Sequence, residues 1–112
     1  MNMKMRANNE VPELTSKEFE EFTKKGTVFI DFFAEWCMPC LMMAPIVDEV
    51  SEKFRKKIKF GKVNVGDNQQ LASKFEVSSI PNFVLFKDGK PVERFVGAIS
   101  SDELEERLKK FA

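Results

Sequence analysis

Two cysteines separated by two residues, Cys37 and Cys40, are the side chains of this sequence whose type and spacing could do chemistry. Thiols at this spacing can form a disulfide with each other and exchange it with the disulfide of another molecule. The sequence contains no histidine, which excludes histidine-based acid–base catalysis, Ser-His-Asp triads and most zinc and haem sites. Thiol–disulfide exchange is therefore the first hypothesis.

Three other interpretations of Cys37 and Cys40 compete with redox chemistry. A structural disulfide across two residues closes a very small loop and stabilises a fold little, and a cytosolic chain would keep it reduced. A zinc site needs four ligands, and the sequence offers no further cysteine or histidine, so a metal would require a dimer. Inert thiols are the third interpretation. We expect no metal site and a redox-active pair.

The segment around the cysteines indicates which of the two reacts first. An apolar run over 28–33 predicts a buried central strand, and apolar residues at helical spacing follow over 39–54. Cys37 should therefore lie near a helix N-cap, where free N–H groups and the helix dipole favour a thiolate. Pro39 suits the first helical turn, and the Cys40 amide is the natural donor to the Cys37 sulfur. We expect an exposed nucleophile at Cys37 and a more buried resolving thiol at Cys40.

Strands and helices alternate along the rest of the sequence. Capping boxes begin helices after Thr15 and Ser100, Pro45 should kink the helix over 39–54, and Asp88-Gly89 predicts a hairpin turn. Met42 and Met43 are expected in the core. Strands are predicted at 11–14, 28–33, 59–65, 83–86 and 92–96, and helices at 15–25, 39–54, 67–75 and 100–111.

This order, β-α-β-α-β-α-β-β-α, predicts an α/β fold. The β-α-β unit over 28–65 requires a parallel strand pair with a right-handed crossover, and the final hairpin adds antiparallel strands. The result is a central mixed sheet with helices on both faces, and sites in such sheets form beyond the carboxyl ends of strands. Residues 11–112 form one domain, and residues 1–10 are expected to be a flexible arm.

Two opposite charges interrupt neighbouring apolar strands. Asp31 lies within the run over 28–33 and Lys62 within the run over 59–65. A lone buried carboxylate is unfavourable and tends to bind a proton, so contact between the two side chains is expected. One interpretation is a structural ion pair. The other makes Asp31 the proton acceptor for Cys40 during resolution.

Several short motifs of this sequence occur together in one known family. They are Ala34-Glu35-Trp36-Cys37 with Pro39-Cys40, Asp31, Lys62, Pro45, Ile80-Pro81, Lys87-Asp88-Gly89 and Gly97-Ala98. With them the sequence resembles the thioredoxin family over about residues 11–112. The resemblance implies a thioredoxin-like fold and thiol–disulfide exchange with protein substrates. It also implies that Asp31 is the buried acid, that Lys62 faces it, and that Pro81 is a cis-proline against the cysteines.

The sequence departs from the family pattern at four positions. Met38 and Gly66 stand where glycine and aspartate are common, and Leu41 and Asn82 where lysine and threonine are common. None of these changes removes a reacting group, but residues near the cysteines tune redox potential and partner choice. The expected substrate-docking surface is rich in aromatic and apolar side chains, as interfaces are: Trp36, Met38, Pro39, Ile80, Pro81, Gly97 and Ala98.

The sequence thus predicts a monomeric, cytosolic protein-disulfide reductase without a bound cofactor. Eighteen basic residues balance eighteen acidic ones, which argues against nucleic-acid or membrane-surface partners. No apolar run reaches membrane-span length, and residues 1–10 carry no apolar stretch typical of a signal peptide. A thioredoxin reductase-type protein is expected as electron donor. The alternatives are glutaredoxin- or isomerase-like exchange, and a non-catalytic binding module that uses the groove around Trp36.

Overall fold

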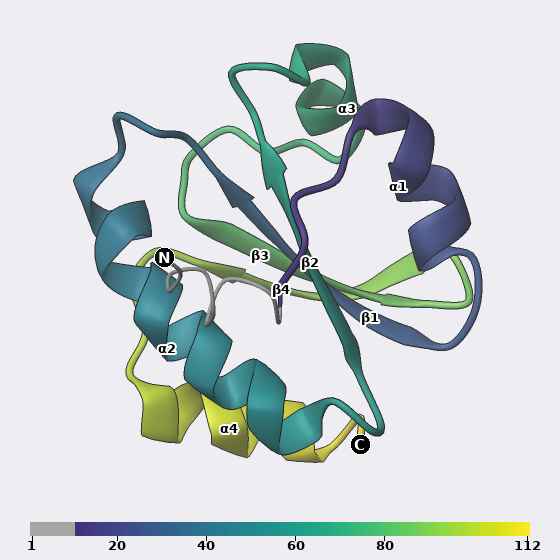
Figure 1. Ribbon diagram of the computed structural model, residues 1–112, viewed down its shortest axis with the longest axis vertical. Helices are drawn as coiled ribbons and strands as arrows, with labels where there is room; N and C mark the ends of the chain where they lie inside the picture. The colour runs from purple at the N-terminus through teal and green to yellow at the C-terminus, as the bar shows by residue number, and fades with distance from the viewer. Residues whose placement is uncertain (1–10) are drawn as a thin grey trace, which may run out of the picture.

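A computed structural model describes residues 11–112, which form one four-stranded sheet and four helices (Figure 1). The predicted arm over 1–10 lies outside the described residues. No helix within 11–112 is long and apolar enough to cross a membrane. The elements are α1 (Ser16–Thr23), β1 (Thr27–Phe33), α2 (Met38–Phe54), β2 (Lys59–Asn64), α3 (Gln69–Lys74), β3 (Asn82–Lys87), β4 (Lys90–Val96) and α4 (Ser101–Lys109).

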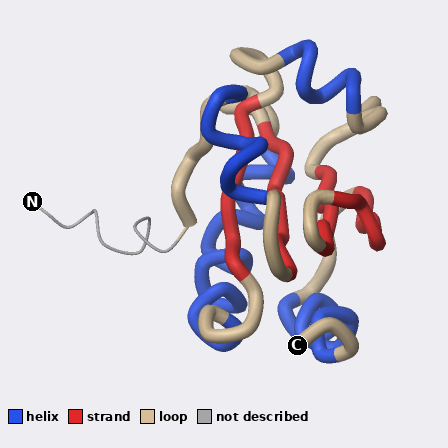
Figure 2. The backbone as a smooth tube through the Cα atoms, turned by 90° about the vertical axis from the view of Figure 1, so that its right-hand side faces the viewer, coloured by secondary structure: helices blue, strands red, loops and turns tan. Residues whose placement is uncertain are grey.

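The sheet is mixed, with the strand order β2-β1-β3-β4. β1 pairs in parallel with β2 and antiparallel with β3, and β3 pairs antiparallel with β4. One core cluster joins the sheet to α2 and α4, and a second joins the opposite face to α1 and α3. Figure 2 shows the strands, in red, with helices at the top and at the bottom of the same view. The predicted mixed sheet with helices on both faces is confirmed.

The central strand β1 supplies both cores because its side chains alternate between the two faces of the sheet. Phe29 belongs to the cluster beneath α2 and α4, whereas Ile30 and Phe32 belong to the cluster beneath α1 and α3. All three side chains are fully buried. Asp31 lies on the same face as Phe29, so the fold places a carboxyl group beneath α2.

The prediction of a strand over 11–14 is wrong, because this segment is not one of the strands of the sheet. The segment forms one parallel bridge between Glu13 and Lys62. Lys62 N donates to Pro12 O at 2.9 Å, and Leu14 N donates to Lys62 O at 2.8 Å. The pairing stops there because Pro12 has no N–H to donate and because the capping box at Thr15 turns the chain into α1.

The sequence signals at the helix and hairpin ends are found in the structure. Thr15 Oγ1 accepts a hydrogen bond from Glu18 N, and the Glu18 carboxylate accepts one from Thr15 N, which completes the capping box. Ser100 Oγ accepts from Glu103 N at 3.2 Å at the start of α4. The β3–β4 turn places Asp88 and Gly89 at φ 50° and 89°, the conformation that the Asp-Gly pair predicts.

Gly61 in β2 leaves room for Leu14 and for Phe22 of α1 to pack closely against the sheet. A Cβ atom at this position would lie 2.8 Å from Leu14 Cδ1 and 3.0 Å from Phe22 Cε2. We expect Gly61→Ala to lower the free energy of unfolding by about 1–3 kcal/mol, because extra atoms in a packed core force shifts of its side chains. Urea unfolding measures this. Gly66→Ala, whose methyl group meets only Asn64 Oδ1 at 3.2 Å, is the control with a smaller expected loss. Equal stability of Gly61→Ala and the parent protein would contradict the prediction.

Candidate active site

Cys37 and Cys40 lie where β1 passes into α2, beyond the carboxyl end of the central strand. Cys37 is the N-cap residue of α2, and its Sγ accepts a hydrogen bond from Cys40 N at 3.2 Å. A disulfide bond joins the two residues, whose Cα atoms are 5.3 Å apart. Pro39 lies in the first turn of the helix. Backbone N–H groups in this turn have no acceptor within the helix, so the absence of an N–H in proline breaks no helical hydrogen bond. This local geometry is the one that the sequence predicts.

The expected contrast in exposure between the two cysteines is wrong for the disulfide form. Cys37 and Cys40 are each 5% exposed. The bond holds the two sulfurs together, and the two cysteines form a buried cluster with Ala34, against which Phe33 and Ile80 pack. The distinction between nucleophile and resolving thiol therefore depends on their positions in the helix, not on exposure in this state.

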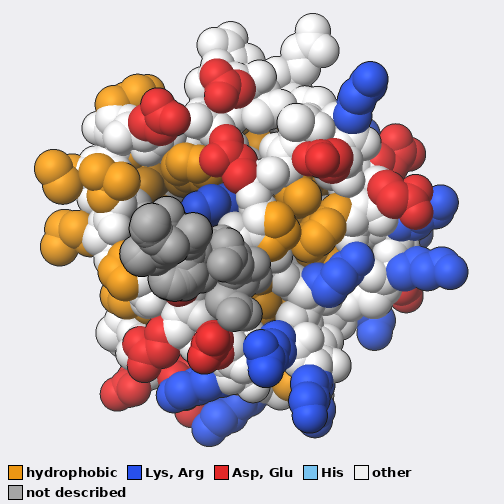
Figure 3. Space-filling view, in the orientation of Figure 1, with side chains coloured by type: hydrophobic (Ala, Val, Ile, Leu, Met, Phe, Trp, Pro, Cys, Tyr) orange, Lys and Arg blue, Asp and Glu red, His pale blue; other side chains and the backbone are white. Residues whose placement is uncertain are grey.

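Four exposed apolar side chains lie in the loop before α2 and in its first turns, next to the two cysteines in sequence, and we call this group the apolar rim: Trp36, Met38, Leu41 and Met42. They are between 53% and 78% exposed. Figure 3 shows hydrophobic side chains gathered at the left of the view, over the N-terminal end of α2 and the loop before it. The expectation that Met42 belongs to the core is wrong, whereas Met43 is buried as expected. One position along a helix turns a side chain by about 100°, which takes Met42 off the buried face.

The remaining residues of the predicted docking surface lie on the β3 side of the disulfide. The Ile80–Pro81 peptide bond is cis, and Ile80 packs against the cysteines. Gly97 N donates to Pro81 O at 2.8 Å, which fixes the segment after β4 beside the proline. Pro39 and Ala98 are exposed, but Pro81 is buried. Pro81 therefore lies beneath this surface and contributes no exposed side chain to it.

Asp31 is buried beneath α2 without a full set of hydrogen bonds. Its side chain is 5% exposed, and Oδ1 has no hydrogen-bond partner within the described part of the chain. The pKa of Asp31 is raised from 3.8 to about 7, mainly by burial; the Lys62 ammonium lowers it, and the Asp48 carboxylate adds a smaller increase. A carboxyl group that titrates near neutral pH can accept and release a proton under working conditions.

Lys62 is the partner of Asp31 in the register of β1 and β2, as the sequence predicts. Its ammonium lies 5.6 Å from the centre of the Phe33 ring and is half-buried. Among residues 11–112, the salt bridges do not include one between Lys62 and Asp31. Lys62 therefore acts on Asp31 through its charge at a distance, and the direct contact expected from the sequence is absent from this part of the chain.

Sequence reasoning misses two features near the site. Asp48 on α2 places a negative charge near Asp31. Its position two helical turns after Cys40 is the sequence signal from which this proximity could have been predicted. Asn82 is buried, and its Oδ1 accepts a hydrogen bond from Arg94 Nη1 at 3.0 Å. Arg94 Nη2 donates to Phe75 O at 2.5 Å. Asn82 thus holds an arginine that joins β4 to the end of α3, a contact between segments distant in sequence.

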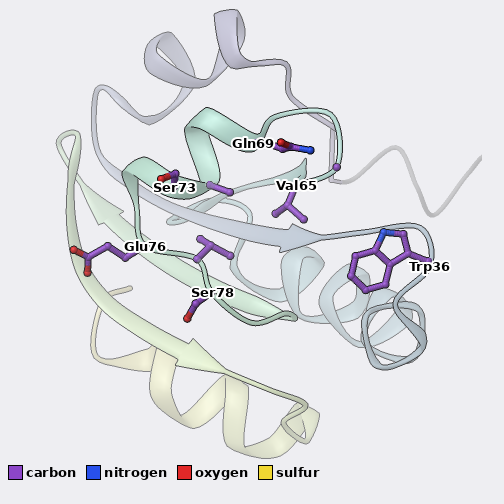
Figure 4. Close-up of a pocket in the computed structure, with 9 residues that line it drawn as sticks. Trp36, Val65, Gln69, Ser73, Glu76 and Ser78 are labelled. Carbon is purple, nitrogen blue, oxygen red and sulfur yellow. The ribbon is translucent and has the colours of Figure 1, made fainter.

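A groove of about 740 Å³ extends from Trp36 along α3. Figure 4 shows Trp36 at one end, Gln69 and Ser73 on the α3 side, and Glu76 at the opposite end with its carboxylate pointing away from Trp36. Gly66, one of the four departures from the family pattern, also lines this groove. The volume falls within the range of ligand sites, so the groove offers room for a segment of a bound molecule beside the disulfide.

The exposed position of Leu41 predicts an electrostatic effect on Cys37. Leu41 is one helical turn after Cys37, and Leu41 N donates to Cys37 O at 3.1 Å. In Leu41→Lys a nearby ammonium favours the thiolate, so alkylation of reduced Cys37 below neutral pH should become about twofold faster, since solvent screening limits the gain. The rate of iodoacetamide alkylation measures it. Val92→Lys adds the same charge at the far end of the sheet and should leave the rate unchanged. Slower alkylation of Leu41→Lys would contradict this placement.

Comparisons with known proteins agree with this geometry. The family model described as Thioredoxin matches residues 10–110. A thioredoxin from Chlamydia pneumoniae is 40% identical over 99 residues, covering 88% of this chain and 96% of its own. Thioredoxin 1 from a Nostoc species is 41% identical over 106 residues, covering 95% and 98%. The solved structure of a mutant thioredoxin from Halobacterium salinarum matches with a TM-score of 0.81 at 32% identity, covering 90% of this chain and 88% of that one.

Proposed function

The chain belongs to the thioredoxin family, and on that premise we propose how its residues divide the work of disulfide reduction. Its Cys37–Cys40 pair makes it a thiol–disulfide oxidoreductase, and relatives named thioredoxin make it a protein-disulfide reductase. In our proposal Cys37 is the nucleophile, Cys40 the resolving thiol and Asp31 the proton acceptor.

One observation supports this assignment of the two cysteines more than any other. Cys37 caps α2, and its sulfur accepts the hydrogen bond of Cys40 N. In the reduced protein the same amide and the positive end of the helix dipole stabilise a thiolate at Cys37. Cys40 lies inside the first turn and has no comparable donor within the described residues. Cys37 is therefore the anion that attacks first.

The reaction proceeds in two exchanges. The Cys37 thiolate attacks one sulfur of the substrate disulfide, which breaks that bond, forms a mixed disulfide and releases the first substrate thiolate. Cys40 then loses its proton and attacks Cys37 Sγ, which breaks the mixed disulfide and releases the second substrate thiolate. Two electrons pass to the substrate, and the enzyme is left with the Cys37–Cys40 disulfide.

Asp31 accepts the proton of Cys40 in the second exchange. Its pKa of about 7 suits a base at neutral pH, and its Oδ1 has no hydrogen-bond partner within residues 11–112. Lys62 supports this role as a positioning residue: its charge lowers the pKa of Asp31, which burial and Asp48 raise. Without that charge more of Asp31 would be protonated at neutral pH and unable to accept a proton.

The substrate docks on the surface around the disulfide. Its backbone pairs with the segment at Ile80 and Pro81 as an added strand would, and its side chains contact Trp36, Met38, Pro39, Gly97 and Ala98. The substrates are proteins with accessible disulfides, and a thioredoxin reductase-type protein restores the dithiol. We place the reaction in the cytosol, with the enzyme acting as a monomer.

Trapping with Cys40→Ser tests this function and the order of the two exchanges. The variant keeps the nucleophile but lacks the resolving thiol, so mixed disulfides through Cys37 should persist at least about a hundredfold longer than in the parent protein. Mass spectrometry of the reduced variant after mixing with a disulfide protein measures the adduct. Cys37→Ser is the matched control and should form none. Adducts on Cys37→Ser in place of Cys40→Ser would reverse the assigned roles, and no adduct on either variant would contradict the function.

A further inference from the structure

Three methionines of α2 differ sharply in exposure. Met38 is 64% exposed and Met42 is 67% exposed, whereas Met43 is 2% exposed. Met43 Sδ accepts a hydrogen bond from Ile99 N at 3.5 Å and lies in the core beneath α2 and α4. Two thioethers of this helix are therefore open to small reagents in water, and a third, next to one of them in sequence, is not.

The two exposed methionines belong to the apolar rim. Met38 and Met42 are four positions apart on α2, so they occupy neighbouring places on one side of the helix. Met38 is one of the two residues between Cys37 and Cys40, and Trp36 and Leu41 complete the rim. A chemical change at either thioether therefore alters the surface next to the disulfide.

We propose that Met38 and Met42 form a peroxide-sensitive modification site that controls access of protein substrates to the Cys37–Cys40 pair. A peroxide gives one oxygen atom to the thioether sulfur. The O–O bond breaks, a sulfoxide S–O bond forms, and water leaves when the oxidant is hydrogen peroxide. The sulfur loses two electrons and the peroxide gains two. In the disulfide form the two cysteine sulfurs are bonded to each other and both cysteines are buried, so Met38 and Met42 carry the exposed sulfur atoms of the site.

Oxidation converts a flexible apolar side chain into a polar one and disrupts methionine-rich contacts. A protein substrate that covers the rim would bury sulfoxide oxygens, and a buried acceptor without a donor is unfavourable. A small disulfide reaches Cys37 without covering the rim and avoids this cost. This inference rests on the proposed function, in which the surface around Trp36 and Met38 receives the substrate.

Peptide mapping tests the site. The disulfide form is treated with hydrogen peroxide, the excess is removed with catalase, and fragment-ion mass spectrometry assigns each added oxygen atom. Met38 and Met42 should be oxidised at least about tenfold faster than Met43, because oxidation follows exposure. Cleavage after Lys4 and Arg6 places Met1, Met3 and Met5 on other peptides. Oxidation of Met43 at the same rate as Met38 and Met42 would contradict the proposal that the two exposed methionines form a selective modification site.

A second measurement tests the consequence. The treated protein is reduced with dithiothreitol, desalted and mixed in single turnovers with insulin or with a small aromatic disulfide. Oxidation should lower the rate with insulin about fivefold to thirtyfold, and the rate with the small disulfide less than twofold. Each protein is compared with itself before treatment. The double variant Met38→Leu with Met42→Leu should lose this sensitivity to peroxide, whereas Met43→Leu should keep it.

Two failures can be told apart. If the untreated protein does not reduce insulin, the proposed function is wrong and this inference falls with it. If the untreated protein reduces insulin and oxidation at Met38 and Met42 leaves the ratio of the two rates unchanged, the function stands and the inference is overturned. Equal loss with both substrates also overturns it, because the damage would then lie in the thiol chemistry and not in docking.

Discussion

Replacing Cys37 with serine should reduce the rate of insulin disulfide reduction to that of dithiothreitol alone, a loss of at least about a hundredfold. A serine hydroxyl is not ionised near neutral pH and forms no disulfide, so neither exchange can begin. The structure places this sulfur at the N-cap of α2, with the Cys40 amide as its donor. Turbidity of the insulin chains measures the rate, with dithiothreitol as electron source.

The control for Cys37→Ser is the reduced parent protein, because the variant cannot form the Cys37–Cys40 bond. Urea unfolding of both under reducing conditions should give closely similar free energies, since serine and cysteine have similar volumes. A folded Cys37→Ser protein that retains the parent rate would contradict the catalytic role. It would also favour the alternative in which the groove around Trp36 serves a non-catalytic binding module.

Replacing Asp31 with asparagine should raise stability and slow the second exchange. The parent protein buries a carboxyl group whose pKa, about 7, lies well above 3.8. Each pH unit of difference between the folded and unfolded pKa is worth about 1.36 kcal/mol, so a difference of about three units costs about 4 kcal/mol above pH 7. The asparagine side chain carries no charge at any pH. We expect the variant to be about 2–4 kcal/mol more stable at pH 8.

The stability difference between Asp31→Asn and the parent protein should depend on pH, because only the parent carries a titrating group at this position. Between about pH 4 and pH 7 the folded protein holds a proton on Asp31 that the unfolded chain has released. The contribution of Asp31 to the free energy of unfolding therefore falls as pH rises through this window. Urea unfolding of the oxidised forms should show a gap between variant and parent at pH 8 that nearly closes at pH 4. A structural ion pair predicts the opposite, a loss of about 3–5 kcal/mol in the variant at neutral pH.

The kinetic half of the prediction concerns Cys40. Removing a general base usually lowers a rate by about a hundredfold or more, so single-turnover release of reduced substrate by Asp31→Asn should be slower by at least about tenfold at pH 7. The parent rate should rise with pH through about 7 as Asp31 ionises, and the variant should lack this rise. A destabilised variant with an unaltered release rate would contradict the catalytic role of Asp31.

Local signals account for what could be predicted from the sequence. The capping box at Thr15, the Asp88-Gly89 turn and the position of Cys37 at a helix start depend on neighbours within a few residues, and all are present in the structure. The pairing of Asp31 with Lys62 also follows, because parallel strands in a β-α-β unit must lie side by side.

The errors concern contacts between distant segments and the states of single side chains. The sequence places Met42 in the core because methionines on a helix usually pack inward, but only the packing of α2 on the sheet determines which face is buried. The equal burial of Cys37 and Cys40 depends on the disulfide between them. The influence of Asp48 on Asp31 and the contact of Arg94 with Phe75 need the folded arrangement.

The single bridge between Glu13 and Lys62 has a consequence for self-association. β2 is an outer strand of the sheet, and unpaired N–H and C=O groups on an outer strand invite pairing with another chain. The bridge occupies both Lys62 N and Lys62 O. On the opposite outer strand, β4, Pro91 lacks an N–H, and Lys90, Glu93 and Arg94 place charges on the strand. Both edges of the sheet are thus poor templates for strand addition, which protects the folded chain against edge-to-edge aggregation at high concentration.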